Sequence, residues 1–135
     1  MSNIMPYDDI FGGQKISLWT SIDISSVEGK MHVQKALGTA DYTADDLKLV
    51  PFPVQNVVVH SVKIESEDDG VINANRTVLI SPDGKTASFT SEGIISSLRN
   101  IFSLFGFPPY DEPLNMIVKE TKTRKGWRTL NLVVV

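Results

Sequence analysis

One segment of this sequence has a clear helical period, and it lies among segments whose patterns are typical of strands. Its apolar side chains recur every three or four residues on one face, at Ile94, Ile95, Leu98, Ile101, Phe102 and Phe105. Thr90 or Ser91 can cap its start, and Gly106 ends it. We therefore predict one helix, with Arg99 and Asn100 facing water, whose apolar stripe packs on a core supplied by strands.

The segments before this helix alternate between apolar and polar residues or are rich in β-branched ones, which is typical of strands. The clearest turn is Ser81–Lys85, where Pro-Asp-Gly predicts a tight hairpin connection. Residues 27–30 predict a second turn, and the acidic residues 65–69 predict a solvated loop. Strands are predicted over residues 16–25, 31–37, 55–64, 76–80 and 86–89.

A hairpin is also predicted after the helix, and it concentrates positive charge. Apolar residues flank Lys119–Arg128, a segment that holds five of the thirteen Lys and Arg residues, one carboxylate and a glycine at its tip. Strands, one helix and a final hairpin predict a mostly β fold: an OB-fold-like small β-barrel with one α-helix before the last two strands. Residues 14–135 form this single domain, and residues 1–13, which have no sustained period, are predicted to be a flexible N-terminal arm.

Charge is distributed unevenly along the 135 residues. The net charge is −3, but residues 113–135 carry five basic residues and one acidic residue, whereas residues 1–112 carry eight and fifteen. A local basic patch can contact phosphates even in an acidic protein. The first residues lack the pattern of a secretory signal, and no apolar run has the length of a membrane span, so we expect a cytoplasmic protein with no membrane partner.

The sequence offers no set of residues for catalysis or metal binding, and we predict that the protein is not an enzyme and has no cofactor and no metal site. There is no cysteine, which excludes disulfides and thiolate ligands. His32 and His60 are isolated on predicted strands, where a histidine is usually structural. Asp68-Asp69-Gly70 does not place carboxylates at the alternating positions that a calcium loop requires.

Binding of a nucleic-acid strand is better supported, because such binding combines a positive surface with aromatic faces on which bases stack. The candidate cations are Lys119, Lys122, Arg124, Lys125 and Arg128, with Lys30, Lys35 and Arg76 outside the hairpin. The candidate stacking residues are Trp127, Trp19, Tyr42, Phe52 and Phe89. The alternatives are structural: Trp127 can simply cover the hairpin, Trp19 can pack under a loop or the arm, and the cations can form a solvated tip.

The C-terminal half resembles a known family. Residues Thr77–Phe89, Ser91-Glu-Gly-Ile with the helix, Leu114–Val118 and Lys122–Leu132 are similar to the small single-stranded DNA-binding proteins of tailed bacteriophages. The resemblance implies an oligonucleotide-binding fold that coats single strands during phage DNA replication or recombination in the host cell, without strong sequence preference and without a cofactor. Single-stranded DNA is the implied partner, and self-association and contacts with replication proteins stay open.

One departure from related cellular proteins is the end of the chain. Those proteins often end in an acidic tail that recruits partners, whereas this chain ends in Leu132–Val135, a predicted strand. An unpaired terminal strand would favour an alternative function, that of a phage structural or assembly protein acting through edge-strand contacts with other proteins.

Overall fold

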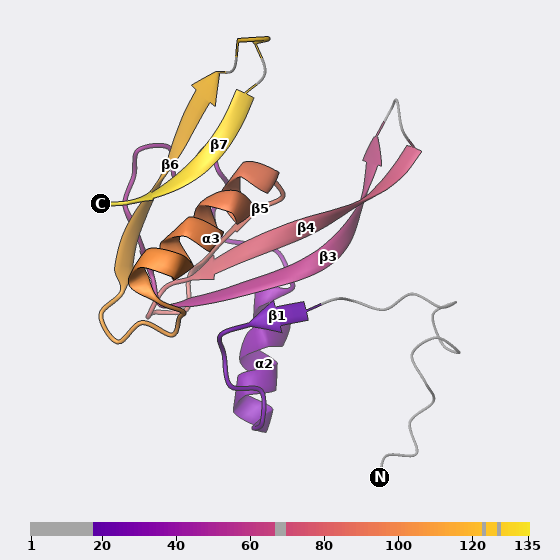
Figure 1. The fold of residues 1–135 in the computed structure, drawn as a ribbon. Helices are drawn as coiled ribbons and strands as arrows, with labels where there is room; N and C mark the ends of the chain where they lie inside the picture. Colours follow the sequence, from indigo (N-terminus) through magenta and orange to yellow (C-terminus); the bar gives the residue numbers. More distant parts are fainter. Residues whose placement is uncertain (1–17, 67–69, 123, 127) are drawn as a thin grey trace.

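The computed structural model describes residues 18–66, 70–122, 124–126 and 128–135. The flexible arm predicted for residues 1–13 lies outside the described residues. The elements follow the order β1–α2–β2–β3–β4–β5–α3–β6–β7 (Figure 1). Their bounds are β1 Leu18–Thr20, α2 Val27–Ala36, β2 Phe52–Val54, β3 Asn56–Ser66, β4 Gly70–Ile80, β5 Thr86–Phe89, α3 Glu92–Phe105, β6 Leu114–Lys122 and β7 Arg128–Val134.

The strands form two antiparallel sheets. One has the order β1-β3-β4-β5 and the other the order β2-β6-β7. The loop after α2 connects the sheets, because Tyr42 forms a bridge with Ala87 of β5 and Lys48 forms a bridge with Val118 of β6. The predicted mostly β fold with a helix before the last two strands is confirmed. It is consistent with a small OB-like β fold, and the described strands form two sheets rather than one closed ladder.

The four-stranded sheet is covered on both faces, which explains its β-branched sequence. Neighbouring residues of a strand point to opposite faces. Val57 and Leu79 therefore pack in the cluster that contains the buried residues of α3, whereas Val58 and Ile80 pack with Ala36 of α2. Figure 1 shows the two helices on opposite sides of β3 and β4. Burial of each such side chain contributes about 1.5–3 kcal/mol.

Helix α3 forms where the apolar stripe predicts it, and its neighbour β7 fixes its position. The Ser91 hydroxyl caps its start by accepting a hydrogen bond from the Gly93 N–H at 3.2 Å, and Gly106 follows its last turn with φ 87°. The Ser97 Oγ accepts a hydrogen bond from the Leu132 N–H of β7 at 3.1 Å. Helix α3 thus covers the free edge of β7 as well as one face of the four-stranded sheet.

The prediction of a turn at 27–30 and a strand at 31–37 is wrong, because this segment is helix α2. The Ser26 hydroxyl accepts a hydrogen bond from the Gly29 N–H at 3.0 Å and so caps the helix. Val33 and Ala36, three residues apart, are its buried side chains, whereas Val27 and Met31 are exposed. Such a narrow apolar face gives a weak helical period, and tertiary packing of Ala36 decides the conformation.

Three other strands differ from prediction, and one of them is β4, which begins at Gly70 instead of residue 76. Strand β1 begins at the first described residue and ends at Thr20, well before the expected end at residue 25. Strand β2 was not predicted, because Pro53 lies at its centre. This strand pairs only with β6, so the proline, which has no N–H to donate, lies on an edge and is exposed.

The final hairpin is confirmed, and the terminal valines are paired. Val133 lies opposite Ile117 and Val134 opposite Met116, and the Val135 N–H donates a hydrogen bond to the Asn115 carbonyl at 2.9 Å. The unpaired terminal strand that would have favoured an assembly protein is therefore not observed.

No helix in the described part of the chain is long and apolar enough to cross a membrane.

Candidate nucleic-acid interface

The β6–β7 hairpin presents its cations on both faces and at its tip. Lys122 and Arg128 are cross-strand partners and share one face, and Lys119 lies on the other face opposite Asn131. Beyond the strands, Arg124 and Lys125 precede Gly126, whose φ of 81° suits a tight turn. These five cationic side chains are exposed.

Ion pairs divide this cationic set in two. Glu120 pairs with Arg128 at 2.9 Å and with Lys48 at 2.9 Å, and Lys48 also reaches Asp45 at 3.3 Å. The hydrogen bond from Lys48, followed by the charge of Arg128, holds the pKa of Glu120 below its usual value, so Glu120 stays ionised. Glu120 therefore links the hairpin to Lys48 in the loop before β2, whereas Arg128 is neutralised within the hairpin.

The other four cations of the hairpin lack such partners. Within the described part of the chain, Lys119, Lys122, Arg124 and Lys125 form no ion pair. The hairpin thus offers at least these four uncompensated charges to an anionic ligand, and a phosphate backbone that wraps the hairpin can contact them.

Trp19 belongs to an aromatic cluster near the C-terminal end of α3. Its ring centroid lies 5.5 Å from that of Phe102 and 6.3 Å from that of Phe107, and the two phenylalanine rings are 5.3 Å apart. The cluster stays open to solvent, because Trp19 is 39% exposed and Phe107 is 69% exposed. Trp19 therefore packs on neighbouring rings and still presents part of its surface to solvent.

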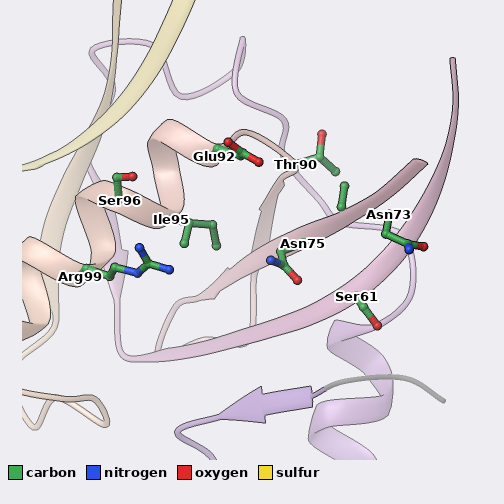
Figure 2. A pocket seen from close by; sticks show the side chains of 9 residues that line it. Ser61, Asn73, Asn75, Thr90, Glu92, Ile95, Ser96 and Arg99 are labelled. Carbon is green, nitrogen blue, oxygen red and sulfur yellow. The ribbon is translucent and has the colours of Figure 1, made fainter. Parts of the chain in front are cut away.

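Two adjoining hollows lie between α3 and the ribbon formed by β3 and β4. One, of about 350 Å³, is shown in Figure 2 and the other, of about 510 Å³, opens over the aromatic cluster. Asn75, Ile95 and Arg99 line both, so the hollows form one groove, which we call the α3 groove. In Figure 2 Ile95 and Arg99 extend from α3 toward the strand that carries Asn75.

The chain matches, over residues 13–135, a family model of the Phi29 type described as phage single-stranded DNA-binding protein. The chain belongs to this family. The match covers nearly the whole chain and so confirms the resemblance carried by the C-terminal half. No curated protein and no solved structure matches the chain. The phage single-stranded DNA-binding family is a family of non-enzymatic DNA-binding proteins.

For a single-stranded DNA-binding protein, several predicted contact residues are placed unfavourably. Phe52 and Phe89 are each 4% exposed and belong to the core, so their faces cannot receive a base. Tyr42 is half-buried, with its edge against the Phe52 ring. Its surrounding hollow of about 600 Å³ is lined by three carboxylates and one lysine: Asp41, Asp46, Asp83 and Lys85. That lining repels phosphates. Trp127 lies outside the described residues.

Arg76, a predicted DNA contact, forms hydrogen bonds within the protein. Its guanidinium donates hydrogen bonds to the Ala36 carbonyl at 3.1 Å and the Gly38 carbonyl at 2.7 Å, at the end of α2. It also donates to His60 Nε2 at 3.1 Å. Lys30 and Lys35 are exposed on α2, on the other side of the sheet from α3, so the structure does not bring them to the α3 groove.

Apart from Trp19, the residues of the α3 groove were not predicted as a site, although local signals were present. Asn73 and Asn75 are two apart in a strand and thus share a face, and Ile95, Arg99 and Phe102 recur at helical spacing. Arg99 was predicted only to face water, which the structure confirms. Only the packing of α3 on the ribbon brings the two sets together.

Neither histidine belongs to a metal site in the described residues, which contain no group of three or more side chains able to hold a metal ion. His60 is buried against Arg76, and burial, followed by the arginine charge, lowers its pKa. His32 is half-buried on α2, not on a strand.

Proposed function

We propose that this protein coats single-stranded DNA during phage DNA replication or recombination in the cytoplasm of the host cell. The observation that carries the proposal is the family match over residues 13–135. The β6–β7 hairpin supplies the phosphate contacts through Lys119, Lys122, Arg124, Lys125 and Arg128. Trp127, in the same segment, and Trp19 supply aromatic faces for bases.

Such contacts bind many sequences about equally. Lysine and arginine bound to phosphate fix the position of a strand without reading its bases. Stacking is equally tolerant, because every base has a π-face. The negative charge of the rest of the molecule weakens non-specific binding to other anionic polymers. A single strand is favoured because it is flexible enough to follow the hairpin and expose its bases.

Lys30 and Lys35 are secondary in this proposal. Both are exposed on α2 and can contact phosphates only where a strand passes around the sheet. Tyr42 could contribute only at the edge of an acidic hollow, and Arg76 and Phe52 contribute to stability instead.

The proposal is tested by titrating the protein with oligo-dT while following its tryptophan fluorescence at two salt concentrations. We expect quenching at low salt and a steep loss of affinity at high salt, because cation–phosphate contacts release counterions. A duplex of equal length is the control and should bind more weakly, since its bases cannot stack on side chains. Absence of binding at low salt contradicts the proposed function.

A further inference from the structure

We propose that the α3 groove is a binding site for bases of the same single strand, with Trp19 and Phe107 as stacking faces and Asn75 and Arg99 as polar contacts. The inference rests on the proposed function, because its ligand is the strand whose phosphates the hairpin holds. It assigns binding residues on α3 and the β3–β4 ribbon, outside the basic hairpin.

The aromatic end of the groove has the form of a stacking platform. Phe102 is half-buried and contacts both other rings, so it holds Trp19 and Phe107 in place from beneath. Single exposed apolar residues are ordinary on a protein surface, but three mutually contacting rings open to one hollow are not. Phe107 is 69% exposed, so its ring is open to a ligand.

The middle of the groove has the polarity that base edges require. Ser61 and Asn75 are cross-strand partners, as are Lys63 and Asn73, so all four side chains start from the same face of the ribbon. Amide groups offer both a donor and an acceptor and can therefore accommodate any of the four bases. Opposite them, Arg99 provides a guanidinium that can lie flat on a base or reach a phosphate.

The groove leads toward the basic hairpin. Thr90 and Glu92 line its end at the start of α3, and Ser91, between them, lines the next hollow together with Arg128. Gly93 contacts the backbone of β7 at Leu130. Since α3 has 14 residues and is about 21 Å long, one extended strand can lie along it and continue onto the hairpin.

Glu92 is the residue of the groove that opposes an anionic strand. Its carboxylate is exposed at the start of α3. A phosphate passing there would be repelled, so the strand is expected to turn its phosphates outward and its bases toward the ribbon. Removing this charge in Glu92→Gln should therefore strengthen oligo-dT binding about two- to threefold at low salt.

The test uses the Trp127→Phe protein, in which Trp19 is the remaining tryptophan. Oligo-dT should quench Trp19 emission and protect it from acrylamide. In this background Asn75→Ala and Arg99→Ala should each weaken binding at least threefold, and the double variant about tenfold. Asn100→Ala and Lys85→Ala, which change exposed residues outside the groove, are the matched controls and should bind normally. Circular dichroism checks that each variant is folded.

The outcomes separate this inference from the proposed function. If the wild type binds oligo-dT but Trp19 is unaffected and the groove variants bind normally, the groove inference fails and the function stands. If the wild type does not bind, both fail. Should Trp127→Phe not fold, Trp19→Ala in the otherwise unchanged protein gives the same decision through its affinity. If Phe107→Ser converts an oligomer to a monomer without weakening binding, a second copy is the occupant and the inference is overturned.

Discussion

At the scale of single residues, the hydrogen-bond and ion-pair partners of a cationic side chain determine whether it is available to a ligand. Arg76 is as cationic as Lys122, but two carbonyl groups at the end of α2 and the ring of His60 occupy its guanidinium. Because a guanidinium only donates, His60 Nε2 must accept, which requires the neutral imidazole. The residue pair therefore stabilises the docking of α2.

This arrangement predicts that the protein is less stable in mild acid. The pKa of His60 is lowered from its usual 6.5 by burial and by Arg76, so the unfolded chain binds the proton more readily than the folded one. The contribution of His60 to stability is thus present above pH 6.5 and is lost as the pH falls through the lower folded-state pKa.

Urea denaturation at pH 7 and pH 5 measures the effect. His60→Gln keeps an acceptor for Arg76 but cannot titrate, and it should lose less stability over this interval than the wild type. Equal losses in the two proteins would contradict the assignment.

At the scale of elements, helix α3 organises both the core and the candidate site. One side of α3 carries its buried residues, and its exposed side forms a wall of the α3 groove. The Ser97 Oγ accepts a hydrogen bond from the Leu132 N–H at the free edge of β7. Helix α3 and β7 approach each other closely at Gly93, where an added Cβ would collide with the Leu130 carbonyl oxygen. A glycine is needed there for contact with the strand, although alanine favours helix.

We therefore expect Gly93→Ala to lower the free energy of unfolding by about 1–3 kcal/mol, as overpacking does, despite a gain of about 1 kcal/mol in helix propensity. Thermal and urea denaturation measure this change. Asn100→Ala, an exposed substitution on the same helix, is the control and should not destabilise the protein. A Gly93→Ala protein as stable as the wild type would contradict this prediction, because it would show that α3 and β7 can move apart with no loss in the free energy of unfolding.

At the scale of the whole molecule, an acidic protein carries one concentrated cationic projection. The net charge is −3, and the hairpin beyond its base provides Lys122, Arg124 and Lys125 without ion pairs in the described structure. Association with a phosphate chain then depends on a small number of contacts. That number can be measured, because each contact contributes about 0.7 to the slope of log affinity against log salt for a single strand.

Replacing Lys122, Arg124 and Lys125 together with alanine should reduce the magnitude of that slope by about 2 and weaken binding at low salt much more than at high salt. Oligo-dT titrations over a range of salt concentrations measure both quantities. An unchanged slope would place the phosphate contacts elsewhere on the molecule, with Lys30 and Lys35 on α2 as the next set to replace.

The sequence by itself determined the elements whose signals are local. The helix, the Pro-Asp-Gly turn at residues 82–84 and the final hairpin around Gly126 were predicted correctly, because helical period and turn chemistry depend on neighbouring residues. The last residue of the predicted core stripe, Phe105, is 52% exposed. The resemblance carried by the same segments was confirmed by the family match.

Only the tertiary structure decided the features that depend on distant residues. Segment 27–36 is a helix because Ala36 packs on the sheet and Arg76 holds the helix end. Phe52 is buried because β2 pairs with β6, sixty residues later in the chain. The α3 groove forms where α3 packs across the ribbon of β3 and β4, two strands that precede it in the sequence. Burial, edge position and convergence of side chains are properties of contacts between distant segments, and no local pattern encodes them.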